Sequence, residues 1–283
     1  FDEVLRIGRE ARIPVQITHI KLGSTPVWNT AATRMPALFE RARREGVDLK
    51  ADVYPYTFWH STIRVIVPHR DWFNAAKVGR AIADNGGPSA VRLGKYVPQP
   101  ELAGKTLDEV ARAWAVTPVE AYMRIVRETS GEDDSGESRE VVLVTSMNEA
   151  DLRWFIVQPD IMFSSDGTLH GAHPRGAGAF PRVLGRYVRE LKLLPLETAI
   201  HKMTGLPARQ LGLDDRGRIE RGSVADLVLF DPATVLDRST VEQPQAAPSG
   251  IDAVMVSGEW VLRDATVTGA HPGRVLRRSR RGR

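Results

Sequence analysis

The sequence predicts an α/β fold in which parallel strands alternate with helices, followed by a small antiparallel β unit. Two observations support this. As far as about residue 210, short apolar runs rich in β-branched residues alternate with helical patterns, and the hydrophobic period then changes to two. The composition, with 42% hydrophobic and 26% charged residues, is typical of a globular protein with a core. We therefore do not expect a disordered chain.

The first elements form one β-α-β unit. A helix is expected over about residues 2 to 11, and the β-branched run RIPVQITHI at 12–20 predicts a buried strand. Residues 30 to 45 predict a helix despite Pro36, and Gly46 ends it. The next strand is VDLKADVYPY at 47–56, where Pro55 ends the regular pairing.

Residues 57 to 130 interrupt this alternation. Pro and Gly are frequent up to Pro100, and helical patterns follow at KTLDEVARAWA and PVEAYMRIVRE. We interpret the segment as an insertion that could cover a site.

Two more parallel strands are expected, EVVLVTS at 140–146 and DIMFSS at 160–165, with a helix between them. Four parallel strands are half of the eight in a (β/α)8 barrel, which takes about 250 residues. Residues 1–210 are therefore predicted to form the C-terminal half of such a TIM-like barrel, with its first half upstream of Phe1. A compact four-stranded α/β domain is the alternative.

The C-terminal residues divide into two parts. Residues 211–273 alternate with period two and predict a small antiparallel β-sandwich segment, and residues 274–283 predict a basic disordered tail with six arginines. This tail carries much of the excess behind the net charge of +4, so the charge is weak evidence for nucleic-acid binding. We find neither an apolar run of the roughly 20 residues that cross a bilayer nor a signal peptide, and we expect a cytoplasmic protein.

The chain contains no cysteine. A disulfide framework and a thiolate nucleophile or ligand are therefore excluded within these residues, and any metal must be held by His, Asp or Glu.

Four motifs follow one another along the chain. They are ITHIK at 17–21, DVYPY at 52–56, FSSDG at 163–167 with HPR at 173–175, and RIERGSVADLVLFDP at 218–232. Together they resemble the C-terminal part of the N-acyl-D-amino-acid deacylase (D-aminoacylase) family of the amidohydrolase superfamily. The last motif is similar to amidohydrolases in general, whereas DVYPY combined with SSDG and HPR is narrower.

The resemblance implies zinc-dependent hydrolysis of the amide bond of a small-molecule N-acyl-D-amino acid, without a nucleic-acid or membrane partner. It assigns His19, at the end of its strand, as a Zn²⁺ ligand and Asp166 as the general base and then acid. The family's His-x-His pair, metal-binding cysteine and fifth-strand histidine have no counterpart here. We expect these ligands upstream of Phe1, so this chain alone should be incomplete and inactive.

The substrate's free carboxylate needs cationic or hydroxyl donors. By the resemblance these are Lys21, Tyr54, Ser61 and Arg175, where the match at Ser61 requires one extra residue in FWHST. No role is assigned to His60, His170 or His173.

Several alternatives stay open. From the residues alone, His19 could be a loop histidine that bonds a carbonyl, and Asp166 before Gly167 could cap a turn. At the level of function, a cyclic amidohydrolase of the dihydropyrimidinase or dihydroorotase type shares the last motif. A non-catalytic scaffold is the third possibility.

Overall fold

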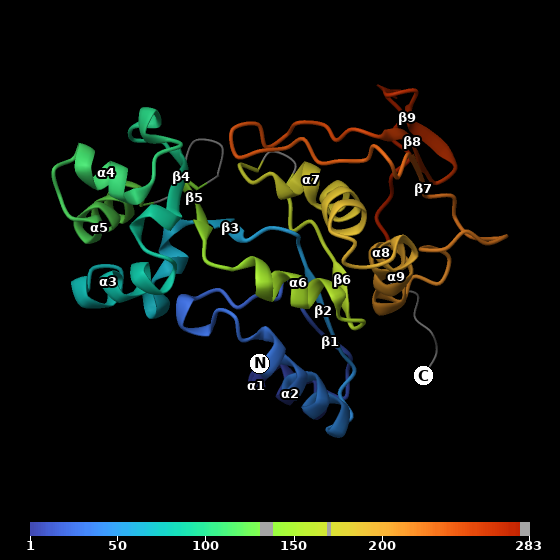
Figure 1. The fold of residues 1–283 in the computed structure, drawn as a ribbon, viewed down its shortest axis with the longest axis horizontal. Coiled ribbons are helices and arrows are strands. Elements are labelled where there is room, and N and C mark those ends of the chain that lie inside the picture. The colour runs from blue at the N-terminus through green and yellow to red at the C-terminus, as the bar shows by residue number, and fades with distance from the viewer. Residues whose placement is uncertain (131–137, 169–170, 278–283) are drawn as a thin grey trace.

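Three β-sheets organise the chain (Figure 1). The structure, a computed structural model, describes residues 1–130, 138–168 and 171–277. Within these ranges one sheet is parallel and the other two are antiparallel. The α/β class predicted from the sequence is confirmed.

The parallel sheet has the strand order β1-β2-β6, formed by β1 (Val15–Ile17), β2 (Leu49–Val53) and β6 (Ile161–Phe163). Its helices are α1 (Asp2–Ala11), α2 (Ala31–Arg44), α6 (Glu149–Val157), α7 (Arg175–Arg182), the π-helical η6 (Val183–Glu190), α8 (Leu196–Met203) and α9 (Gly205–Leu211). Of these, α1, α2, α6, η6 and α8 contribute to the core that packs on the sheet, with Leu5, Phe39, Phe155 and Tyr187 among its members. Because all three strands run the same way, their C-terminal ends lie along one edge.

A second unit lies between β2 and β6. Its antiparallel sheet has the order β3-β5-β4, formed by β3 (Phe58–Ser61), β5 (Glu140–Thr145) and β4 (Val91–Tyr96). Its main helices are α3 (Ala75–Asp84), α4 (Leu107–Ala113) and α5 (Pro118–Glu128), which close a hydrophobic core of their own.

The prediction that residues 140–146 form a parallel strand is wrong. This run is β5, which pairs antiparallel with both β3 and β4. An apolar run shows that a strand is buried but does not show the direction of its partners. The described residues thus contain three strands of the parallel sheet instead of four, and the unit inserted after β2 extends to Thr145.

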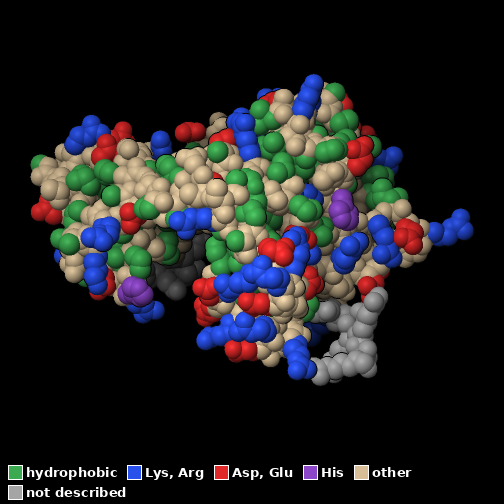
Figure 2. All heavy atoms as spheres, turned by 60° about the horizontal axis from the view of Figure 1, so that its bottom comes forward, with side chains coloured by type: hydrophobic (Ala, Val, Ile, Leu, Met, Phe, Trp, Pro, Cys, Tyr) green, Lys and Arg blue, Asp and Glu red, His purple; other side chains and the backbone are tan. Residues whose placement is uncertain are grey.

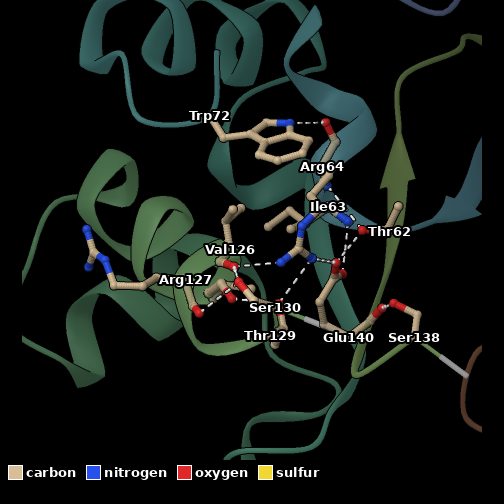
Figure 3. A network of polar contacts seen from close by, with 11 residues as sticks. Thr62, Ile63, Arg64, Trp72, Val126, Arg127, Thr129, Ser130, Ser138 and Glu140 are labelled. Atoms are coloured by element: carbon tan, nitrogen blue, oxygen red, sulfur yellow. Dashed lines mark hydrogen bonds and ion pairs between the residues drawn. The ribbon is translucent and has the colours of Figure 1, made fainter. Parts of the chain in front are cut away.

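A buried ionic network holds the inserted unit together (Figure 3). Glu140 is fully buried and accepts hydrogen bonds from the Ile63 backbone N–H at 2.9 Å and from Arg64 Nη1 at 2.9 Å, as well as from the Thr62 hydroxyl. Arg64 Nη2 also donates to the carbonyl of Val126 in α5 at 2.6 Å. Burial raises the pKa of Glu140, a cost that these donors offset in part. The network joins the end of β3 to β5 and α5.

The C-terminal residues form the predicted antiparallel sheet. Its strand order is β10-β9-β8-β7, formed by β7 (Leu227–Phe230), β8 (Ile251–Val256), β9 (Glu259–Arg263) and β10 (Thr266–Val267). Most of the predicted basic tail, residues 278–283, lies outside the described residues. The boundaries proposed at residues 210 and 274 stay predictions.

The face that carries α1 and α2 shows basic and acidic side chains side by side (Figure 2). Arg41 pairs with both Asp2 and Glu45, and Arg9 also pairs with Glu45. Cations paired in this way do not make a broad basic surface. None of the helices in the described ranges has the length and apolar character that crossing a bilayer requires.

Candidate functional site

The candidate site lies where the three parallel strands end. His19 follows β1, Tyr54 follows β2 and Asp166 follows β6. At this edge, the carboxyl ends of parallel strands present side chains to a ligand. The structure therefore brings together three residues that the sequence analysis had placed at separate strand ends.

A buried carboxylate ties these strand ends to one another. Asp52, the fourth residue of β2, is 5% exposed. It accepts hydrogen bonds from Gln16 Nε2 at 2.5 Å, from the His19 backbone N–H at 2.8 Å and from the Ser164 hydroxyl at 2.6 Å. Because its donors come from β1 and from the end of β6, one side chain fixes the spacing of all three strands.

Two of the strand-end residues have an unusual backbone. His19 has φ 42° and Asp166 has φ 47°, in the left-handed region that residues other than glycine rarely adopt. Such a conformation costs on the order of 1–3 kcal/mol and persists where the surroundings hold it. The Asp52 bond to the His19 N–H is one such restraint. Both residues combine this backbone conformation with a position just after a parallel strand, which makes them functional candidates.

Arg175 and Asp166 form an ion pair at the site. Arg175, the first residue of α7, lies with Nη1 2.8 Å from Asp166 Oδ2, and its side chain is 7% exposed while that of Asp166 is 34% exposed. The guanidinium carbon also lies 4.6 Å from the centre of the Tyr54 ring. A buried guanidinium next to a more accessible carboxylate can bind an anion on one side and leave the carboxylate free to move a proton.

Tyr54 supplies an unused hydroxyl. The residue is 2% exposed, and its phenol oxygen has no hydrogen-bond partner among the described residues. Burial is the main reason that the pKa of Tyr54 is raised well above its usual value, so the hydroxyl keeps its proton. It can therefore donate to a ligand.

Lys21 reaches the same place. Its Nζ lies 5.3 Å from the Tyr54 ring centre and 2.7 Å from both Nδ1 and the carbonyl oxygen of His19. The pKa of Lys21 is lowered to about 8, mainly by burial and in part by the charge of Arg175, against the opposite effects of Asp166 and Asp52.

Only part of a metal site can be recognised. His19 is an exposed imidazole at a strand end, which suits a zinc ligand. The described residues contain no group of three or more His, Asp or Glu side chains that could hold a metal ion. His19 can thus contribute one ligand, and a complete site needs ligands that the described part of the chain does not supply.

Ser61 is not brought together with the other predicted binders. It lies opposite Val142 in the β3–β5 pair, and directly opposed residues of an antiparallel pair share one face of the sheet. Val142 belongs to the core of the inserted unit, so Ser61 faces that core. His60 lies on the other face, and its pKa is lowered by burial first and then by the charge of Arg175. The charges of both Arg175 and Asp166 thus act on His60.

His173 was left without a role by the sequence analysis, but the structure buries it beside Arg175. It is 3% exposed, its Nε2 lies 2.8 Å from the carbonyl oxygen of Phe58, and its Nδ1 lies 3.0 Å from the Arg175 backbone nitrogen. Burial lowers the pKa of His173 to about 3, so the ring is neutral. His170 lies outside the described residues.

The sequence analysis also missed Asp52. A signal was present, because a carboxylate within the strand LKADV must be paired if the strand is buried. Nothing in the sequence identified its three donors, which come from two other strand ends.

Among known proteins, this chain is similar to deacylases of N-acyl-D-amino acids. An N-acyl-D-glutamate deacylase of Alcaligenes xylosoxydans xylosoxydans is 37% identical over 279 residues, which are 98% of this chain and 51% of that protein. A D-aminoacylase of the same organism is 36% identical over 99% of this chain and 52% of its own length. The chain thus spans about half the length of these curated relatives.

Solved structures agree. A crystal structure of D-aminoacylase superposes with a TM-score of 0.80 at 36% identity and covers 98% of this chain and 52% of its own. The N-acyl-D-glutamate deacylase of Bordetella bronchiseptica, solved with zinc and a phosphonate inhibitor that mimics the tetrahedral intermediate, gives a TM-score of 0.80 at 32% identity and the same coverage.

The resemblance to N-acyl-D-amino-acid deacylases found in the sequence is confirmed by these relatives. The amidohydrolase family pattern itself matches residues 20–262, which include Lys21, Tyr54, Asp166 and Arg175 of the site and most of the C-terminal sheet, and begin directly after His19. This chain belongs to the amidohydrolase family.

Proposed function

We propose that the complete protein hydrolyses the amide bond of N-acyl-D-amino acids, releasing a D-amino acid and a carboxylate, with zinc as its metal. The observation that carries the proposal is the Asp166–Arg175 pair, a proton-transfer group 2.8 Å from a buried cation at the edge where the strands end. The relatives that match nearly the whole chain are named for this activity. We further propose that β1, β2 and β6 are part of a (β/α)8 barrel that residues beyond this chain complete.

The carboxylate of the substrate is the group that Arg175, Lys21 and Tyr54 bind. Arg175 offers a planar guanidinium, Lys21 an ammonium and Tyr54 an unused hydroxyl, all grouped around one aromatic ring. Asp166 adjoins this set through its ion pair with Arg175. Ser61 faces the core of the inserted unit and is left out of this set.

Asp166 carries the proton transfers in this proposal. Bound zinc supplies an activated water and polarises the scissile carbonyl. Asp166 accepts the proton of the water and returns it to the leaving nitrogen, which must be protonated before the amine departs. His19 is one of the zinc ligands, and the others come from residues beyond this chain.

The test is hydrolysis of matched N-acetyl-D- and N-acetyl-L-amino acids by the full-length protein, with zinc added and then removed by chelation. We expect zinc-dependent release of amine from the D enantiomer. Turnover of cyclic amides alone would favour the dihydropyrimidinase or dihydroorotase type of activity. A protein that neither binds zinc nor hydrolyses either class would be a non-catalytic scaffold.

A further inference from the structure

We propose that His173 is a positioning residue that fixes Arg175, and through it Asp166, and that it connects the inserted unit to the site. The proposal rests on the function proposed above. It starts from the two ring nitrogens of one buried histidine, each of which has a backbone partner.

The hydrogen bonds define the tautomer. The Arg175 backbone N–H donates to Nδ1, so Nδ1 must carry a lone pair and the ring proton must be on Nε2. Nε2–H then donates to the carbonyl of Phe58 in β3. Because both nitrogens are engaged, His173 has no free position for a metal or for proton transfer.

Aromatic packing fixes the orientation of the ring. His173 stacks on Phe58 with ring centres 4.2 Å apart and planes inclined by 17°. The ring of Tyr56 meets it edge-on at 5.2 Å, and that of Tyr54 does so at 6.1 Å. The imidazole cannot turn away from Arg175 without losing these contacts.

The chain that follows His173 is also restrained. The carbonyl of Pro174 accepts hydrogen bonds from the Ser239 hydroxyl at 3.0 Å and from the Gly178 backbone N–H at 2.8 Å. A side chain at Gly178 would collide with Ser239 and Tyr56, so α7 packs closely at this point. The backbone position from which Arg175 extends is therefore set from several directions.

The consequence for the site follows from the position of Arg175. Arg175 is the first residue of α7. Its guanidinium lies 2.8 Å from Asp166 Oδ2 and at the same time packs against the Tyr54 ring. Displacement of its backbone by about 1 Å is enough to misalign groups of this kind. His173 therefore acts on substrate binding through Arg175 and contacts no reacting atom itself.

Three variants of the full-length protein separate the two hydrogen bonds. His173→Phe keeps a flat ring but removes both bonds. His173→Asn places an amide oxygen near the position of Nδ1 and can still accept from the Arg175 N–H. His173→Gln can instead extend an amide nitrogen to the Phe58 carbonyl, and it lacks the acceptor for Arg175.

KM for an N-acetyl-D-amino acid should depend on whether the residue at position 173 accepts the hydrogen bond from the Arg175 backbone N–H. We expect His173→Phe and His173→Gln to raise KM about tenfold, the value of one lost hydrogen bond of ordinary strength. His173→Asn should stay within about threefold of wild type. If His173 had a purely structural role, KM would instead change in parallel with Tm. Tm should be similar for His173→Asn and His173→Gln, because each variant loses one hydrogen bond. Equal KM values for these two variants, or an unchanged KM in His173→Phe, would overturn the proposal.

Hydrogen exchange at the Arg175 amide provides a readout that does not depend on activity. It should be faster than wild type in His173→Phe and His173→Gln and protected in His173→Asn. If the wild-type protein hydrolyses no N-acyl-D-amino acid, the proposed function fails while this measurement still decides the role of His173. Equal exchange rates at the Arg175 amide in all three variants would refute the positioning role of His173.

Discussion

Replacement of Asp52 by alanine should loosen the strand ends that carry the site. The carboxylate accepts three hydrogen bonds, from Gln16, His19 and Ser164. Bonds of this kind to a charged group contribute about 1.5–3 kcal/mol each. None of the three donor residues is buried, so water can replace the carboxylate as their acceptor in the variant, and we expect Asp52→Ala to lower the free energy of unfolding by only about 2–4 kcal/mol.

Asp52→Asn is the matched control. Its Oδ1 can still accept from the His19 N–H and the Ser164 hydroxyl, the two bonds that Oδ1 makes in the native protein. Its amide nitrogen faces Gln16, whose own amide can turn so that the oxygen accepts. We therefore expect a loss of about 1 kcal/mol, the net value of one ordinary hydrogen bond.

The assay has two parts, both on the full-length protein at a fixed zinc concentration. Urea unfolding gives the change in midpoint, and hydrogen exchange reports the His19 amide, whose acceptor is Asp52 Oδ1. Exchange at His19 should accelerate in Asp52→Ala and stay near wild type in Asp52→Asn. If both variants unfold at the same urea concentration, or if the His19 amide in Asp52→Ala keeps its protection, the assignment of Asp52 as the tie between the strands is refuted.

Four other substitutions test the site and the inserted unit. Asp166→Asn should retain zinc but lower kcat by about 10²–10⁴-fold, because it removes the proton carrier; normal turnover would eliminate this role. Arg175→Ala should raise KM for substrates with a free carboxylate, whereas Ser61→Ala should leave KM unchanged because Ser61 faces away; the opposite result would contradict the assignment of the faces. Glu140→Ala should lower the free energy of unfolding by about 3–5 kcal/mol in urea unfolding, because it removes the carboxylate that pairs with the charge of Arg64, and a loss below about 1 kcal/mol would show that the network is not needed.

The sequence predicted the elements that carry local signals. It identified the strands at 12–20, 47–56 and 160–165 and the C-terminal sheet, because the order of apolar and polar residues along each segment indicates its burial and its hydrophobic period. The run at 140–146 was correctly identified as a strand but assigned to the wrong sheet. Its partners, β3 and β4, lie between about 45 and 90 residues earlier in the chain, and pairing over such distances leaves no local pattern.

The site was predictable as far as strand ends determine it. Lys21, Tyr54 and Asp166 lie near one another because they follow parallel strands that end at a common edge, and Arg175 reaches the same place from the start of α7. Ser61 was different, because the face on which a strand residue lies reverses with a shift of one position. The register Ser61↔Val142 decides its direction, and this register depends on β5.

The supports of the site could not be identified from residue types. Asp52 and His173 have the side chains of a metal ligand or a catalytic group, yet in the structure one ties strands and the other binds two backbone groups. The partner of His173 in the inserted unit is Phe58, and the Glu140 network fixes the far end of the same strand. Geometry at Arg175 therefore depends on a unit that contributes none of the proposed catalytic groups. Because β3 contacts His173 and His173 contacts Arg175, we expect sequence changes in the inserted unit to alter substrate binding.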